Sequence, residues 1–220
     1  IIIPVYNENA TILEILKKIE SVQDIQKQII IVDDGSNDGS YELINGFNFI
    51  SEHKIIRHDF NSGKGSCIKS AQNYITGDIV IIQDADLEYD PNDYNEVIKA
   101  IYENDKKVVY GSRVLNKKRY DQKNFISNFR IFANHILTLL TNFLFLQNLT
   151  DAHTCYKAFD SKVFKEINLI ENDFAFCPEI TAKVSKLGYK IFEVPISYFG
   201  RTYDEGKKIS FYDGIRAILV

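Results

Sequence analysis

Three apolar runs, each followed directly by acidic or polar residues, constrain the fold of this 220-residue chain more than any other feature. They are IIIPVYNE at the N-terminus, IIIVDDGSNDGS over residues 29–40 and IIQDADLEYDP over residues 81–91. Short continuous apolar runs of this kind are typical of buried parallel strands. The polar clusters should therefore collect at the carboxyl edge of one sheet, where open α/β sheets bind ligands.

Strands and helices alternate along the first half of the chain. We expect strands at 1–5, 28–33, 54–57, 78–83 and 107–110, and helices at about 10–22, 39–49, 64–74 and from Pro91 onward. Such alternation predicts an α/β fold with a mainly parallel sheet flanked by helices. After Gly111 the pattern loosens into a basic loop, a long apolar helix at about 125–146 and a strand at 190–194. Because this second half has few strands, we interpret residues 1–220 as a single domain.

Composition narrows the classes of function. The net charge is −4 and there is no long basic block, so a nucleic-acid partner has little electrostatic support. Three widely spaced cysteines favour reduced thiols in a cytoplasmic compartment. No stretch reaches the roughly 20 apolar residues that a transmembrane helix needs. The chain begins inside a strand and stops on GIRAILV, which is typical of a domain trimmed at both ends.

The third cluster contains a D-x-D pattern, Asp84 and Asp86, followed by Glu88. Alternate carboxylates in an extended segment can face the same way and share a hard divalent cation with a diphosphate. We therefore predict that these three residues bind Mg²⁺ or Mn²⁺, which would neutralise the charge on a departing nucleotide diphosphate. The competing interpretation is a solvated acidic turn before a helix.

The three clusters resemble the motifs of family 2 glycosyltransferases with the GT-A fold, especially dolichol-phosphate mannose synthases and bacterial polyprenyl-phosphate glycosyltransferases. The likeness continues in order through NSGKGSCIKSA, YGSRV, LTDAHTCYKAF, FCPEITAKVSKLGYKIFEVPI and GRTYDEGKKI, and so covers nearly the whole chain. It implies a GT-A fold with a nucleotide-sugar donor half at 1–112 and an acceptor half at 113–220. The implied reaction transfers a sugar, with inversion, from a nucleotide diphosphate to a polyprenyl phosphate (dolichyl or undecaprenyl) at the cytoplasmic face of a membrane.

The resemblance also assigns residues to the nucleotide pocket. Tyr6 would pack on a ring, Glu8 would accept hydrogen bonds from ribose hydroxyls, and Asp34 would accept the imino proton of uracil or guanine. The full set of implied donor-contacting residues on this side is Pro4, Tyr6, Glu8, Val32, Asp34 and Ala85. Taken singly, the same residue types also suit a turn after a strand or the first turn of a helix.

Basic residues in the second half are expected to hold phosphate oxygens. Guanidinium suits that geometry best, which favours Arg113 and Arg201, with Lys207 in the GRTYDEGKKI loop. The resemblance implies that this loop closes over the site. For Lys117 and Lys118, in the basic loop, a solvated face is favoured.

The resemblance names Asp86 and Asp151 as catalytic residues. Asp151 would act as a base or orient the acceptor; a carboxylate satisfied by local amides is the equal alternative. The resemblance also implies that Glu179 lies near the active site, but it assigns no definite role to this residue.

Several alternatives stay open from sequence alone. NSGKG lacks the Walker spacing and either flanks the donor pocket or allows a tight entry into a helix. The apolar helix at 125–146 either packs in the core or forms a surface that faces a membrane. An acceptor hydroxyl with Asp151 as base and a silent nucleotide-sugar binding subunit are the competing functions, whereas the missing G-x-G-x-x-G disfavours an oxidoreductase. The sequence leaves the sugar undetermined, and GDP and UDP equally possible.

Overall fold

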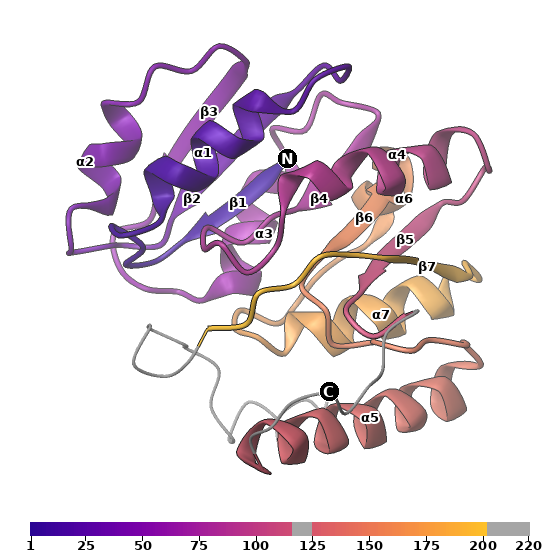
Figure 1. Cartoon of the computed structure of the whole chain (residues 1–220). Helices are drawn as coiled ribbons and strands as arrows, with labels where there is room; N and C mark the ends of the chain where they lie inside the picture. The colour runs from indigo at the N-terminus through magenta and orange to yellow at the C-terminus, as the bar shows by residue number, and fades with distance from the viewer. Residues whose placement is uncertain (116–124, 202–220) are drawn as a thin grey trace.

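A seven-stranded sheet forms the centre of the protein. The computed structural model describes residues 1–115 and 125–201, with the side chains of residues 125–130 excepted. The strands are β1 (Ile2–Val5), β2 (Gln28–Asp33), β3 (Glu52–Arg57), β4 (Ile79–Ile82), β5 (Val108–Ser112), β6 (Lys157–Asp160) and β7 (Ile191–Pro195). Their order across the sheet is β3-β2-β1-β4-β6-β5-β7. The two halves of the chain thus contribute strands to one sheet (Figure 1).

Pairing in the sheet is parallel except at β6, which runs antiparallel to both β4 and β5. The expected α/β fold with a mainly parallel sheet is therefore confirmed. Sequence analysis did not anticipate β6. It is four residues long and begins with Lys157, whose side chain is fully buried and donates to the Ala152 carbonyl, 3.0 Å away.

Helices cover the sheet, with α1 and α3 on opposite sides of it (Figure 1). The helices are α1 (Ile12–Ser21), α2 (Ser40–Asn45), α3 (Lys64–Gln72), α4 (Tyr94–Tyr102), α5 (Phe125–Phe145), α6 (Ser161–Glu166) and α7 (Phe176–Lys186), with a short 3-10 turn, η1 (Pro91–Asp93), before α4. The apolar stripe of α1, formed by Ile12, Ile15, Leu16 and Ile19, is fully buried, as its helical spacing predicts. Helix α5 packs against α7.

The register of the parallel strands sets the position of the site. Val5 lies opposite Asp33 in the pairing of β1 with β2, and β1 also pairs with β4. The segments that follow these three strands consequently emerge side by side at the carboxyl edge. This places the polar clusters of the sequence next to one another.

The glycine-rich segment 61–65 joins two distant parts of this edge. On one side, the amides of Ser62 and Gly63 donate to the carboxylate of Asp34, at 3.0 and 2.7 Å. On the other, the Ser66 amide donates to the Asn172 carbonyl at 2.9 Å. Gly63 has φ +96°, and a Cβ there would lie 2.4 Å from the Asn172 carbonyl oxygen. The glycine therefore permits a close approach of two backbones, and α3 begins at the next residue.

Replacing Gly63 with Ala should destabilise the protein by roughly 3 kcal/mol, because backbone strain in the left-handed region and a clash act together. Gly188→Ala is the matched control: its φ is +86° but its Cβ would meet nothing within 4 Å. The control should cost only about 1 kcal/mol, from strain alone. Urea unfolding of both variants measures the difference, and equal losses would show that the approach to Asn172 is not tight.

Candidate active site at the carboxyl edge of the sheet

The D-x-D segment follows β4 as a tight acidic turn. It begins after Gln83, a buried residue whose side-chain carbonyl accepts from the Tyr94 hydroxyl at 3.0 Å. The Glu88 amide donates to Asp86 Oδ1 at 3.0 Å, which closes the turn. Asp86 and Glu88 are 7% and 9% exposed, so neither belongs to a solvated acidic turn. Buried carboxylates need cationic partners or hydrogen-bond donors.

Asp84 has its own cation. The ammonium group of Lys64, at the start of α3, pairs with Asp84 Oδ1, and only 10% and 15% of the two side chains are exposed. Lys64 also lies near the rings of Phe174 and Phe176. Burial opposes its charge, but Asp84 holds the pKa of Lys64 above its ordinary value. The glycine-rich segment thus brings a lysine to the first acidic residue of D-x-D, a role that sequence analysis missed.

Glu8, Asp86 and Glu88 lie around Arg201: the first two contact its guanidinium group, and Glu88 lies 3.9 Å from its Nε and accepts from its backbone amide. Arg201 Nη1 lies 3.1 Å from Glu8 Oε2, and its Nη2 lies 2.5 Å from Asp86 Oδ2. The Arg201 amide donates to Glu88 Oε1 at 2.7 Å. Arg201, predicted to hold phosphate, therefore lies among carboxylates that were predicted to hold the nucleotide and the metal ion.

This concentration of negative charge changes the pKa of Asp86. Burial, together with the carboxylates of Asp84 and Glu88, raises the pKa of Asp86 to about 7, although Arg201 acts in the opposite direction. A carboxyl group whose pKa is raised by its neighbours gains free energy when a further cation arrives. The cluster is therefore chemically suited to a hard divalent cation, which prefers carboxylate oxygens.

A second buried ion pair joins β5 to the loop before β6. Arg113, directly after β5, donates from Nε and Nη2 to the two carboxylate oxygens of Asp151, at 2.7 and 2.8 Å. Glu193 of β7 accepts from the amides of Thr150 and Asp151 and so holds this loop in place. Burial would raise the pKa of Asp151, but Arg113 holds it below its ordinary value. Asp151 is thus an orienting partner of Arg113 and a weak base.

Tyr198 connects the two parts of the site. It forms an isolated β-bridge with Tyr89, its hydroxyl donates to Glu88 Oε2 at 2.9 Å, and its ring lies 5.1 Å from the Arg113 guanidinium carbon. The side chain of Tyr198 therefore contacts both the Arg113–Asp151 pair and the carboxylate cluster. Nothing in the sequence around Tyr198 signals this contact.

The other predicted nucleotide-pocket residues lie at the same edge. Pro4 and Tyr6 are half-buried at the end of β1. Val32 is fully buried in β2, so only its backbone can face a ligand. Ala85 is buried within the D-x-D turn, and its carbonyl accepts from the Thr11 hydroxyl at 3.1 Å. Lys207, Lys117 and Lys118 lie outside the described residues.

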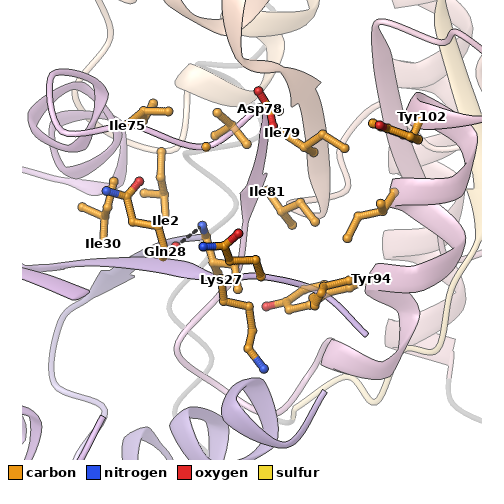
Figure 2. Close-up of a pocket in the computed structure, with 16 residues that line it drawn as sticks. Ile2, Lys27, Gln28, Ile30, Ile75, Asp78, Ile79, Ile81, Tyr94 and Tyr102 are labelled. Atoms are coloured by element: carbon orange, nitrogen blue, oxygen red, sulfur yellow. Dashed lines mark hydrogen bonds between the residues drawn. The ribbon is translucent and has the colours of Figure 1, made fainter. Parts of the chain in front are cut away.

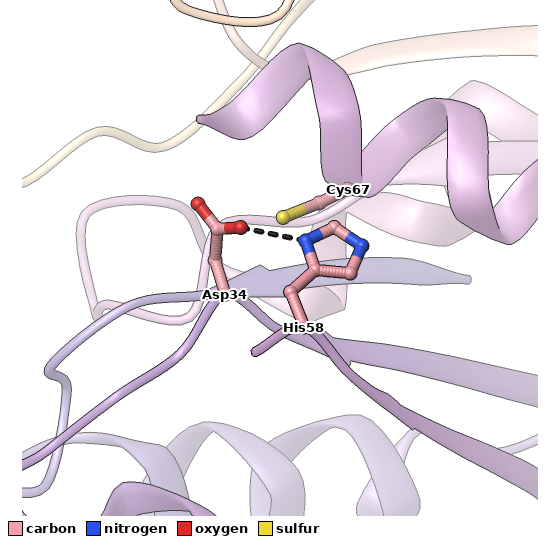
Figure 3. Close-up of side chains that lie close together, drawn as sticks. All are labelled: Asp34, His58 and Cys67. Carbon is pink, nitrogen blue, oxygen red and sulfur yellow. Dashed lines mark hydrogen bonds and ion pairs between the residues drawn. The ribbon is translucent and has the colours of Figure 1, made fainter. Parts of the chain in front are cut away.

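Asp34 lies in a hydrogen-bonded network with His58 and Cys67 (Figure 3). Potential ligand atoms of the three residues lie within 4.8 Å of one another, as in a metal site. Protein groups, however, already satisfy them: His58 Nδ1 is 2.7 Å from Asp34, and its Nε2 is 2.8 Å from the Ser70 hydroxyl. Burial and Asp34 raise the pKa of the Cys67 thiol, whereas zinc binding needs a thiolate. We interpret the network as an anchor for the glycine-rich segment.

A pocket of about 220 Å³ lies at the opposite, amino edge of the sheet (Figure 2). Half of the residues that line it are isoleucines, among them Ile2, Ile30 and Ile79, and Lys27 and Asp78 are among its polar residues. This pocket shares no residue with the acidic cluster.

Glu179, at the start of α7, serves the structure of the loop before it. Its carboxylate accepts from the amides of Ile170 and Glu171, at 2.6 and 2.9 Å, and pairs with Lys183. Through this loop, which contacts the glycine-rich segment, Glu179 supports the position of Lys64 indirectly.

Comparison with known proteins relates the chain to glycosyltransferases. Residues 1–168 match the family model described as Glycosyl transferase family 2. A UDP-N-acetylglucosamine–dolichyl-phosphate N-acetylglucosaminyltransferase of Methanococcus voltae is 30% identical over 98% of this chain and 91% of the relative. An undecaprenyl-phosphate 4-deoxy-4-formamido-L-arabinose transferase of Edwardsiella ictaluri is 27% identical over 94% of this chain, but the match spans only 62% of that relative.

A solved structure shows the same fold. Glucosyl-3-phosphoglycerate synthase of Mycobacterium tuberculosis, in complex with Mn²⁺, UDP and glucosyl-3-phosphoglycerate, superposes with a TM-score of 0.68 at 15% identity. The superposition covers 99% of this chain and 76% of the synthase.

Asp151→Asn should lower the free energy of unfolding at pH 7 by roughly 3 kcal/mol, because the buried Arg113 loses its counter-charge. The folded-state pKa of Asp151 lies below the ordinary value, so the stabilisation is complete above about pH 4 and is lost as the pH falls through the folded pKa. Urea unfolding at pH 7, 5 and 3 should show the difference between the parent and the variant narrowing only at pH 3.

The control for this comparison is Asp105→Asn, since the Asp105 side chain is 88% exposed beside Lys107. That variant should stay within about 0.5 kcal/mol of the parent at every pH. An Asp151→Asn protein as stable as the parent at pH 7 would contradict the importance assigned to the buried pair.

Proposed function

Because the chain belongs to glycosyltransferase family 2 and has the GT-A fold, we propose that this glycosyltransferase moves one sugar from a nucleotide diphosphate to a polyprenyl phosphate, with inversion and with the help of Mg²⁺ or Mn²⁺. The observation that carries the proposal is that carboxylate oxygens of Glu8, Asp86 and Glu88 lie 3.1, 2.5 and 3.9 Å from nitrogens of one guanidinium group at the carboxyl edge, that of Arg201. The polyprenyl acceptor is supported by the names of the relatives from Methanococcus and Edwardsiella.

The carboxylate cluster fits a divalent cation. Asp86 and Glu88 would hold it, with Glu8 at the side of β1, while Asp84 stays neutralised by Lys64. When bound, the cation would compensate the negative charge that develops on the leaving nucleoside diphosphate. The solved M. tuberculosis relative contains Mn²⁺ together with UDP, which supports this assignment by analogy.

The acceptor side suits a phosphate group. A phosphate oxygen already carries the electron pair that attacks the anomeric carbon, so the transfer needs no general base; the bond to the diphosphate breaks and its electrons leave with the nucleotide. Arg113, aligned by Asp151 and beside Tyr198, presents a guanidinium group for phosphate recognition. A hydroxyl acceptor would require Asp151 as the base, and its lowered pKa disfavours that role. Asp34 as the reader of the base stays a prediction, as its carboxylate also binds Ser62 and Gly63.

Helix α5 supplies an apolar surface for a membrane that contains the acceptor. Along it, Ile136, Leu139, Phe143 and Leu144 are between 47% and 79% exposed. Among the described residues, no helix is long and apolar enough to cross a bilayer. Apolar side chains on one such face favour a position at the interface of the bilayer. We therefore propose that α5 contacts the membrane surface; the cytoplasmic face stays a prediction.

The direct test is transfer of labelled sugar from a panel of UDP and GDP donors into extractable polyprenyl phosphate, with Mn²⁺ or with EDTA. The parent protein should label the lipid fraction only with the metal ion. Asp86→Asn should lower the rate at least about 100-fold, as expected when one charge-stabilising group is lost. Asp78→Asn makes the same charge change at an exposed position on the amino edge and should keep the parent rate.

Each other outcome of this assay has a definite meaning. Transfer that persists in EDTA, or in Asp86→Asn, would contradict the metal site. Label that appears in a water-soluble glycan would replace the phosphate acceptor with a hydroxyl. Donor binding without transfer to any acceptor would indicate a silent binding subunit.

A double substitution, Phe143→Ser with Leu144→Ser, tests the membrane surface. The affinity for anionic phospholipid vesicles, measured by sedimentation, should fall by at least roughly tenfold, since full burial of one apolar side chain contributes about 1.5–3 kcal/mol and about 1.4 kcal/mol is tenfold. Ile50→Ser, which removes an 89% exposed isoleucine from the loop before β3, should sediment as the parent does. Unchanged binding of the double variant would remove α5 from the interface.

A further inference from the structure

Arg201 lies where the proposed function places a divalent cation. Two of its guanidinium nitrogens contact Glu8 and Asp86 at 2.5–3.3 Å, and its Nε lies 3.9 Å from Glu88 Oε1. These are the same carboxylates that are assigned to the metal ion. One arginine charge against three carboxylates leaves the cluster short of positive charge.

The position of Arg201 is determined by the backbone that carries it. The Ser197 amide donates to Asp93 Oδ2 at 2.7 Å, and the Phe199 amide donates to the Glu88 carbonyl at 2.9 Å. With the bridge between Tyr89 and Tyr198, these bonds hold the segment 197–201 against the D-x-D turn. These bonds, together with the one from the Arg201 amide to Glu88, hold the backbone of residue 201 beside the carboxylate cluster.

The Arg201 guanidinium has the charge sign that the carboxylate cluster needs, but its geometry does not let every N–H group find a partner there. Arg201 Nε is buried and has no hydrogen-bond partner among the described residues. A buried donor without a hydrogen-bond partner costs free energy. This cost makes it easier for another cation to displace the guanidinium from the cluster. A divalent ion carries twice the charge, and Mg²⁺ takes six oxygen ligands in octahedral geometry, so carboxylate oxygens of the cluster can share it with the phosphate oxygens of a nucleotide.

We propose that Arg201 and the divalent ion compete for Glu8, Asp86 and Glu88, and that the ion displaces the guanidinium when it arrives with the nucleotide diphosphate. The inference rests on the proposed function, because it takes this cluster as the metal site. The released guanidinium then has the diphosphate as a new anionic partner. Arg201 consequently makes binding of the ion weak without the nucleotide and strong with it, a coupling between two ligands of one site.

The test is Mn²⁺ binding to the whole chain, measured by electron paramagnetic resonance of the free ion, first without nucleotide. Arg201→Gln should bind Mn²⁺ about tenfold more tightly than the parent, a factor within the usual range of such couplings. Arg201→Lys keeps a competing charge and should stay within about threefold of the parent. Arg57→Gln removes an arginine that pairs with Asp33, away from the cluster, and should leave the affinity unchanged.

A second titration adds saturating UDP or GDP. The nucleotide should raise the Mn²⁺ affinity of the parent by a larger factor than that of Arg201→Gln, because only the parent transfers a guanidinium to the diphosphate. A purely structural role of Arg201 would not produce this difference between the two factors.

The outcomes separate this inference from the proposed function. Equal or weaker Mn²⁺ binding by Arg201→Gln, with Mn²⁺-dependent transfer intact in the parent, overturns the competition alone. Absence of Mn²⁺ binding in the parent and in all variants, each folded by circular dichroism, overturns the metal site and the competition together. Tighter binding in Arg201→Gln but not in Arg57→Gln supports the competition.

Discussion

Parallel pairing of β1 with β2 and β4 is the constraint on which the site depends. Because these strands run in the same direction and in register, the residues after each of them must emerge at one edge. Five carboxylates thereby lie along this edge: Glu8, Asp34, Asp84, Asp86 and Glu88. The fold creates this concentration of charge, and the remaining features of the edge can be understood as ways of compensating it.

Each carboxylate at this edge has its own set of partners that offset its negative charge. Asp84 pairs with Lys64, and Asp151 pairs with Arg113, both in well-buried contacts. Asp34 accepts hydrogen bonds from the Ser62 and Gly63 amides and contacts His58 Nδ1. In the cluster around Asp86, three carboxylates share the single charge of Arg201. An excess of negative charge at one point of a ligand-binding edge is the property expected of a site for a divalent ion and a diphosphate.

The strands that carry the acidic clusters were predictable because continuous apolar runs are unusual outside buried parallel strands. The same reasoning could not find β6, whose four residues include the buried Lys157 and lack any period. It also overestimated α2, which ends at Asn45 where the expectation ran to 49, and it missed that Pro91 opens a 3-10 turn before α4. In each case the boundary depends on tertiary contacts that a local pattern does not encode.

For the site, sequence shows which charges exist but not how they pair. Asp86 and Glu88 follow from one motif and Glu8 from another, whereas the partner of Asp84 depends on Gly63 packing against Asn172, more than a hundred residues further along the chain. The motif around Asp151 indicated a functional position, yet its bidentate contact with Arg113 comes from the end of β5 and its support by Glu193 from β7, both distant in the sequence. Long-range pairings of this kind need coordinates.

The central claim is that the carboxyl edge binds a divalent ion and a nucleoside diphosphate together. Anomalous diffraction from a crystal grown with Mn²⁺ and UDP or GDP would test it most directly. We expect one strong manganese peak bounded by Asp86 and Glu88, next to the diphosphate, with the Arg201 guanidinium moved onto phosphate oxygens. A manganese peak at Asp34, His58 and Cys67, or a nucleotide bound without manganese near Asp86, would contradict the assignment.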